Sequence, residues 1–233
     1  MKLHKLDWKS LLLGDHSYLD MTDECYFTDE YECHHQRGIK PLILSLKRGH
    51  QPVIQDLARQ LTSALPHEWA RAYTFVPMPP SSGLSSPLKS LVWRLPVGDV
   101  RNLLAQGRCT LASHNGWRPT PLQRAQLITL NELQVDPEPR TVVIVDDVLA
   151  TGSHFRAAKM LVRVRWPRMR VIGLFLARVC SRRSGSCHFE TADHGNDQTC
   201  EVDPRRTDSM IVRPFHCLEI DTIDQVHKGH HSR

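Results

Sequence analysis

Residues 141–159 read TVVIVDDVLATGSHFRAAK, and this stretch decides the fold class. Residues 141–145 form a continuous apolar run, which is typical of a strand buried on both faces of a parallel sheet. Apolar positions with helical spacing follow from Phe155 to Val162, and Pro167 predicts the end of that helix. A buried strand that turns directly into an amphipathic helix indicates an α/β protein.

The elements around this stretch extend the same prediction. Residues 171–177 form a second apolar strand, so strand, helix and strand indicate parallel pairing. Residues 72–77 are expected to form a further strand, and the aromatic, alternating residues 26–31 suit an edge strand. Two helices joined by a turn are expected between residues 39 and 65. We therefore expect an α/β fold with a central, mainly parallel sheet flanked by helices.

The chain is expected to form one domain over residues 1–233. Residues 81–120 are rich in Ser, Pro, Gly and Arg, which predicts a long flexible loop. The expected parts are a helix-rich lead-in and hood over 1–70, a core over 71–180, and a loop with a C-terminal strand and tail over 181–233.

Composition narrows the function classes. Of the 233 residues, 40% are hydrophobic and 24% are charged, which is an ordinary globular composition. Thirty Lys and Arg against 25 Asp and Glu leave a net charge of +5, which suits a phosphate-bearing partner without by itself indicating nucleic acid. No apolar run reaches the roughly 18 residues that a membrane span needs, and the start lacks a signal-peptide pattern. We expect a cytoplasmic protein with no membrane association.

The seven cysteines are expected to be reduced thiols in that compartment. They contain no C-x-x-C pair. The Cys33-His34-His35 cluster and the Cys- and His-containing stretch 187–200 offer zinc-ligating side chains, but neither has the tight spacing of a zinc ribbon. Scattered thiols are the favoured interpretation.

Two adjacent acids mark the candidate site. Asp146 and Asp147 lie where the buried strand is expected to end, and ligands of open α/β sheets bind at the carboxyl ends of strands. Residues 150–153 (ATGS) lead into a helix, whose N-terminal N–H groups attract anions. A ribose 5-phosphate fits this pattern, because amides can hold the phosphate while the carboxylates hold the 2′- and 3′-hydroxyls or a Mg²⁺ bound to them.

The acid pair also has other interpretations. Response-regulator receivers also end a strand in two acids, but they place the pair near the domain start and lack an immediate T-G-S turn. A Walker-type phosphate loop is excluded because no Gly-Lys-Ser/Thr follows a Gly-rich run. An ordinary strand-to-helix turn with solvated acids stays open as the interpretation without a function.

Residues 145–153 (VDDVLATGS) resemble the phosphoribosyl-pyrophosphate (PRPP) loop of type I phosphoribosyltransferases. The similarity is greatest to the ComF-like, amidophosphoribosyltransferase-like branch, and it runs over about residues 26–180. Three further segments carry it: residues 47–49 resemble the family's K-x-G turn, residues 75–79 its P-V-P strand end, and residues 118–124 its R-x-T-x-x-Q segment.

The resemblance implies a type I phosphoribosyltransferase fold with a small hood from the terminal segments and a long flexible loop. It implies that Mg²⁺ and PRPP, or a nucleotide containing ribose 5-phosphate, bind there. The implied site residues are Asp146 and Asp147 as catalytic groups on the ribose hydroxyls and, through ribose and water, on Mg²⁺; Ala150, Thr151, Gly152, Ser153 and His154 around the 5-phosphate; Pro80, Ser81 and Ser82 at pyrophosphate; and Arg118 in the loop that closes.

The chain departs from the family pattern in three places. His154 stands where the family often has Thr, the N-terminal zinc ribbon of many ComF-like proteins is missing, and the basic loop around Trp117 is less regular.

Two functions therefore stay open. One is transfer of phosphoribosyl from PRPP to a nitrogen nucleophile, or PRPP hydrolysis, with release of pyrophosphate. The other is a catalytically degenerate PRPP or nucleotide sensor, or a partner-binding subunit; because relatives occur in bacterial phage-defence modules, such a protein could act as a defence effector.

A basic stretch over residues 163–183 was also considered as a surface for a nucleic-acid or protein partner. The alternative is a solvated helix face with loop charges. The arginines concerned are Arg163, Arg165, Arg168, Arg170, Arg178, Arg182 and Arg183.

Overall fold

The computed structural model describes residues 1–7, 16–31, 38–80, 86–107 and 119–179. All of them belong to one compact unit, Met1–Thr191. The predictions for Ser81, Ser82 and Arg118, for both Cys- and His-containing stretches and for the C-terminal strand and tail concern residues outside this described part.

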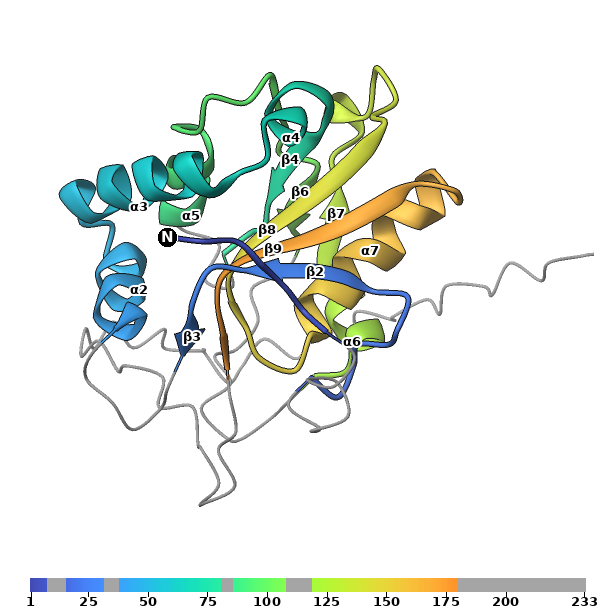
Figure 1. The fold of residues 1–233 in the computed structure, drawn as a ribbon. Helices are drawn as coiled ribbons and strands as arrows, with labels where there is room; N and C mark the ends of the chain where they lie inside the picture. Colours follow the sequence, from blue (N-terminus) through green and yellow to red (C-terminus); the bar gives the residue numbers. More distant parts are fainter. Residues whose placement is uncertain (8–15, 32–37, 81–85, 108–118, 180–233) are drawn as a thin grey trace, which may run out of the picture. The chain divides into compact units, whose positions relative to one another are not determined.

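A seven-stranded sheet forms the centre of the described part (Figure 1). Among the described strands of this sheet every pairing is parallel except that of β1 with β2. The order across the sheet is β1 (His4–Lys5), β2 (Glu24–Phe27), β9 (Arg170–Val179), β8 (Thr141–Leu149), β4 (Thr74–Pro77) and β5 (Asp99–Val100), and β3 (Glu30–Tyr31) also pairs with β9. The expected α/β class with a mainly parallel sheet is confirmed.

The two long strands in the middle, β8 and β9, carry the buried apolar runs of the sequence. Residues 142–145 of β8 are fully buried, as a strand covered on both faces requires. β8 is longer than the expected 141–145, because Asp146 still pairs with Phe175 and the ladder continues to Leu149. The acid pair therefore lies inside the last part of the strand.

Helices cover both faces of the sheet, and successive side chains of β8 point to opposite faces. Val143 and Val145 pack with the helices α2 and α3, whereas Val142 and Ile144 pack with α7. Figure 1 shows α2, α3 and α5 on one side and α6 and α7 on the other. The helix bounds are α2 (Ile39–Lys47), α3 (Gln51–Ala64), α4 (His67–Ala72), α5 (Pro87–Val92), α6 (Pro121–Ala125) and α7 (Ser153–Arg165).

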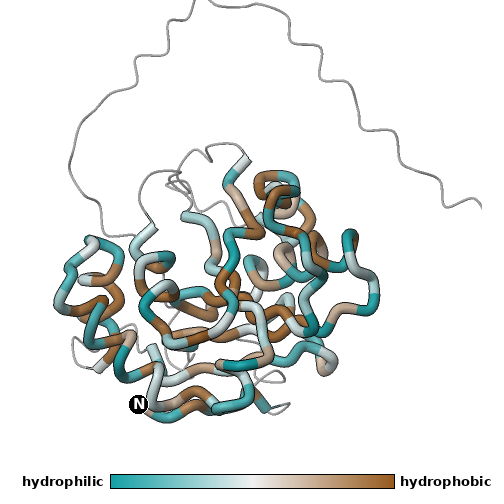
Figure 2. The backbone as a smooth tube through the Cα atoms, turned by 90° about the horizontal axis from the view of Figure 1, so that it is seen from above, coloured by the Kyte–Doolittle hydropathy of each residue, from teal (hydrophilic) through white to brown (hydrophobic). Residues whose placement is uncertain are grey.

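The longer helices α2, α3 and α7 are amphipathic, with an apolar side toward the sheet. In α3, for example, Ile54, Leu57 and Leu61 are fully buried. Hydrophobic and hydrophilic positions alternate along the helical coils in Figure 2, as this one-sided burial requires. No helix in the described ranges is long and apolar enough to cross a membrane.

Part of the expected flexible loop over 81–120 is ordered structure, so that prediction is wrong for residues 86–107. This part contains α5, β5 and the short strand β6 (Leu104–Gln106), which pairs with β7 (Ile128–Leu130) ahead of the 3₁₀ turn Glu132–Gln134. The elements are too short for a periodic signal. They are held by burial, since Leu91, Val92 and Leu103 have no exposed surface.

The expected edge strand over 26–31 is also corrected. These residues divide between β2 and β3, both parallel to β9, and β1 covers the outer side of β2. An alternating aromatic pattern cannot show whether another strand lies beyond it. The N-terminal lead-in thus contributes strands to the main sheet as well as helices to one of its faces.

An ion-pair cluster fastens the segment before β2 to α7. The Lys159 ammonium lies 2.5 Å from Asp23 Oδ1, and both side chains are almost completely buried. Arg156 Nη1 lies 3.0 Å from the other Asp23 oxygen and 2.7 Å from Asp20. A buried carboxylate with two cations keeps its charge balanced, but it becomes costly once a partner is removed.

We therefore expect Lys159→Met to lower the free energy of unfolding by about 3 kcal/mol, because Asp23 would stay buried with only Arg156 beside it. Urea denaturation measures this change. Arg163→Met, at an exposed position on the same helix, is the matched control. The double variant Lys159→Met/Asp23→Asn should lose less stability than Lys159→Met alone. Equal stability of Lys159→Met and Arg163→Met would contradict the prediction.

Candidate functional site

The acid pair lies at the carboxyl end of β8, as the sequence predicted. Asp146 is 7% exposed, and the Asp147 side chain is 22% exposed. The Asp147 backbone N–H donates to Asp146 Oδ1 at 2.9 Å, which fixes the first carboxylate against the strand. Met78 continues from β4 and donates its N–H to the Val145 carbonyl, so the ends of β4 and β8 lie side by side.

Each acid has a basic side chain beside it. Lys47, the last residue of α2, places Nζ 3.2 Å from Asp147 Oδ2. His154 Nδ1 lies 3.2 Å from Asp146 Oδ2. A carboxylate only accepts hydrogen bonds, so Nδ1 of His154 carries the proton in this contact. The site therefore combines two acids with two donors that come from opposite faces of the sheet.

The pKa of Asp147 lies above its ordinary value. The first cause is desolvation of the carboxyl at the strand end, and the second is the charge of the adjacent Asp146. Lys47 and His154 act in the opposite direction without cancelling the rise. A carboxyl in this setting gains from a ligand that brings further hydrogen-bond donors, as the hydroxyls of a sugar do.

The turn after β8 takes the shape that an anion seat needs. Gly152 has φ of +83° in the left-handed region and stands immediately before α7, which explains glycine at this position. The Ser153 N–H donates to Thr151 Oγ1 at 3.4 Å, which closes the turn. The first N–H groups of α7 lack carbonyl partners within the helix, so this end of α7 attracts negative charge.

A segment far away in the sequence supports this turn. Residues 16–23, called here the N-terminal brace, lie against its outer side. A ring nitrogen of the buried His16 contacts the Ala150 carbonyl, and the Tyr18 N–H donates to the Thr151 carbonyl at 3.0 Å. The Leu19 side chain fills the space beside Gly152. The brace, held by the ion pairs of α7, therefore stabilises one conformation of the turn.

Arg124 adds a positive charge at the start of α7. Its Nε donates to Ser153 Oγ at 2.8 Å, and its charge acts on Asp146. Burial lowers the pKa of Arg124, but a guanidinium stays charged at neutral pH. The helix that carries it begins with a capping box, in which Thr120 and Gln123 each accept from the other's backbone N–H. Thr120 lies at the end of the segment expected to be flexible, and with Gln123 it fixes the start of α6.

The remaining predicted residues are placed only in part. Pro80 is half-buried just beyond the end of β4, on the same edge of the sheet as the acid pair, whereas Ser81, Ser82 and Arg118 lie outside the described residues. Within those residues there is no group of three or more His, Cys, Asp or Glu that could by itself hold a metal ion. The two carboxylates at this strand end, Asp146 and Asp147, each have a basic side chain beside them.

Sequence reasoning missed four side chains around the site: Lys47, Arg124, His16 and Leu19. The first two stand inside segments that the family resemblance singled out, so a signal for them existed. The brace has no such signal. Its contacts with residues 150–152 join parts of the chain that are far apart in sequence.

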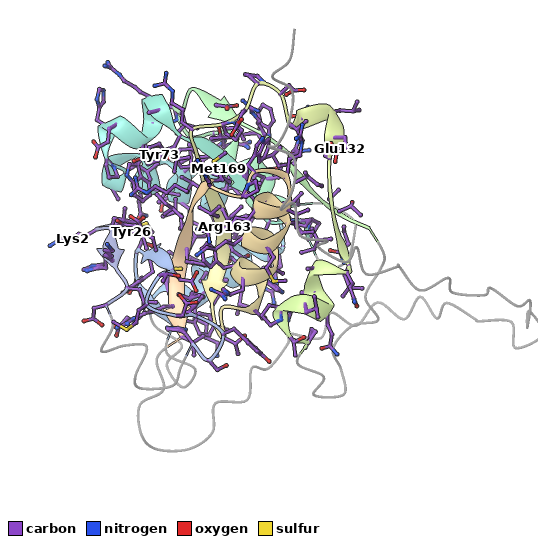
Figure 3. All side chains as sticks on the ribbon, turned by 90° about the vertical axis from the view of Figure 1, so that its right-hand side faces the viewer. Lys2, Tyr26, Tyr73, Glu132, Arg163 and Met169 are labelled. Carbon is purple, nitrogen blue, oxygen red and sulfur yellow. The ribbon has the colours of Figure 1, made fainter. Side chains whose placement is uncertain are left out.

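Two arginines of the basic stretch 163–183 are paired with acids of neighbouring strands. Arg170 pairs with Glu24 at 2.9 Å and Arg178 with Glu30 at 2.7 Å. Arg163, labelled in Figure 3, is exposed near the end of α7. It stands about 15 Å along the helix axis from Ser153, where α7 begins after the turn, at 1.5 Å per residue. A partner at this end of α7 would bind away from the candidate site.

Gly152→Ala is expected to lower the free energy of unfolding by about 3 kcal/mol, the sum of left-handed strain and overpacking. The added Cβ would lie 2.6 Å from two carbons of Leu19. Gly49→Ala is the matched control, since Gly49 also has a positive φ, of +73°, and its added Cβ would meet only Pro87 Cγ at 4.0 Å. Chemical denaturation of both variants separates backbone strain from overpacking. Equal losses of unfolding free energy would show that Leu19 does not pack against the turn.

No family model matches this chain, and no curated protein matches it either. The type I phosphoribosyltransferase assignment therefore stays a prediction carried by residues 145–153 and the segments that accompany them. The structure itself shows an α/β unit with a mainly parallel sheet, in which an acid pair and a helix N-terminus meet at the end of β8.

Proposed function

We propose that this chain binds PRPP, or a nucleotide containing ribose 5-phosphate, at the carboxyl end of β8, on a type I phosphoribosyltransferase fold. The reaction proposed is transfer of the phosphoribosyl group to a nitrogen nucleophile, or PRPP hydrolysis, with release of pyrophosphate. The observation that carries this is the juxtaposition of Asp146 and Asp147 with the turn at Gly152 and the first turn of α7.

The proposed ligand uses both halves of the site. Asp146 and Asp147 accept hydrogen bonds from the 2′- and 3′-hydroxyls, because a carboxylate keeps acceptor capacity beyond one donor per oxygen. The amides at the start of α7 bind the 5-phosphate, and the Arg124 guanidinium, which contacts Ser153, balances its charge. The sugar of this ligand would lie at the strand end and its phosphate at the start of α7.

Catalysis on this arrangement rests on charge stabilisation. Positive charge develops on the ribose ring as pyrophosphate leaves, and the carboxylates at the strand end stabilise that charge. A bound Mg²⁺ would supply positive charge to balance that of the pyrophosphate group. The residues fit such an ion only in part, because Asp146 and Asp147 supply carboxylates and the ligand would have to supply the remaining oxygens.

A second candidate function is PRPP or nucleotide sensing without turnover. The observation that favours it is the contact between His154 and Asp146, which already occupies one oxygen of the acid pair. A ligand would then bind through the turn, Arg124 and Asp147, and the protein would respond by a change in stability or partner binding. Assays for turnover and for binding distinguish the two functions.

The experiment is to incubate the protein with Mg²⁺ and PRPP, with and without a panel of nucleobases, and to measure pyrophosphate release and thermal stabilisation together. Turnover that disappears in Asp146→Asn/Asp147→Asn supports the transferase or hydrolase. Stabilisation without turnover supports the sensor. An unchanged melting temperature and no pyrophosphate release would refute PRPP as the ligand.

Arg124→Met is expected to weaken binding of ribose 5-phosphate about tenfold or more, since a charged hydrogen bond to phosphate contributes roughly 1.5–3 kcal/mol. The affinity of Arg124→Lys should lie between those of Arg124→Met and the wild type, because lysine keeps the charge and loses the planar guanidinium. Isothermal titration calorimetry measures the affinity, and the exposed Arg59→Met on α3 is the control. Wild-type affinity in Arg124→Met would show that Arg124 does not serve the phosphate.

A further inference from the structure

We infer that Lys47 and His154 serve the acid pair in place of a divalent cation, so that the site holds the ribose 5-phosphate part of its ligand without a metal. This inference rests on the proposed function and specifies its metal requirement. A metal would then be needed only for the pyrophosphate part. The inference assigns a binding role to two side chains, one of which, Lys47, lies outside the turn that suggested the ligand.

The contacts of the acid pair support it first. Asp146 receives the Asp147 N–H on Oδ1 at 2.9 Å and His154 on Oδ2 at 3.2 Å. Asp147 has Lys47 on Oδ2 at 3.2 Å. Three of the four carboxylate oxygens therefore already face a donor of the chain itself. Each oxygen keeps a further lone pair, and that remaining capacity suits one hydroxyl better than a hydrated ion.

Charge gives the second step. Mg²⁺ requires near-octahedral oxygen ligands at roughly 2.0–2.1 Å, and it is bound where negative charge is in excess. Here the Lys47 ammonium faces Asp147, and the Arg124 guanidinium acts on Asp146. An approaching dication would be repelled by both cations and would have to displace Lys47. Hydroxyl groups meet no such penalty, since they bring a donor and no net charge.

The placement of the two donors is the third step. Lys47 follows Leu46, and His154 precedes Phe155; both neighbours are 1% exposed and belong to the core. The backbone at each donor is therefore held by packing on opposite faces of the sheet. An exposed ion pair alone contributes little to stability, about 0–1 kcal/mol. Lys47, whose side chain is 47% exposed, therefore contributes mainly by placing a positive charge beside Asp147.

Calorimetric titration of the full chain with ribose 5-phosphate, in EDTA and then in excess MgCl₂, tests the inference directly. We expect dissociation constants that agree within about twofold in the two buffers, a difference of less than half a kilocalorie per mole. A dissociation constant at least about tenfold weaker in EDTA would overturn the inference. The probe lacks pyrophosphate, so a metal carried by that group cannot obscure the result.

Lys47→Met gives a second, independent readout. In EDTA this variant should bind ribose 5-phosphate about tenfold more weakly, and MgCl₂ should restore most of the loss because Asp147 is now open to a cation. Its affinity for Mn²⁺ alone, followed by electron paramagnetic resonance, should rise above that of the wild type. Lys89→Met removes the same charge from an exposed position on α5 and should change neither quantity. Wild-type affinity in EDTA, or no gain in Mn²⁺ binding, would overturn the role of Lys47.

The outcomes separate this inference from the proposed function. Binding of ribose 5-phosphate that appears only with MgCl₂ leaves the ligand assignment standing and removes the inference. No binding in either buffer removes both. A thermal melt of Lys47→Met, whose side chain is half exposed, shows that the variant is folded before either comparison is made.

Discussion

The parallel pairing of β8 with β9 is the constraint on which the rest of the structure depends. It places the apolar runs of the two strands side by side, and helices on both sides of the sheet bury them. It also continues through Asp146 to Leu149, so the acid pair is held by strand geometry instead of by a loop. A site on a strand end is more rigid than one on a connecting segment, and the turn into α7 begins directly from it.

Electrostatics at this strand end follow from the same geometry. Two carboxylates on adjacent residues repel each other, and their environment is only partly open to water. Basic side chains from three elements lie at this strand end: Lys47 at the end of α2, His154 in α7 and Arg124 in α6. In the proposed function, Lys47 and His154 lie on the side of the ribose hydroxyls, and Arg124 lies on the side of the phosphate. The same division underlies both proposals above.

The N-terminal brace connects stability with the site. Its acids, Asp20 and Asp23, are paired with Arg156 and Lys159 on α7, while Leu19 rests against Gly152. The ion pairs hold the brace to α7, and the brace supports the turn that precedes α7. A change in the brace would therefore reach the turn before α7 without altering any residue of that turn.

The sequence by itself determined the class of fold, the two central strands, the helix after the turn and the place of the acid pair, because buried strands and amphipathic helices leave local periodic patterns. It did not show α5 or the pairing of β6 with β7, since elements this short carry no period and form through burial of a few side chains. Only the tertiary structure decided which charges stand beside Asp146 and Asp147 and that His16, Tyr18 and Leu19 support the turn. Contacts of this kind join segments far apart in the chain, and the physical reason is that packing of the whole core, not any local pattern, sets their distance.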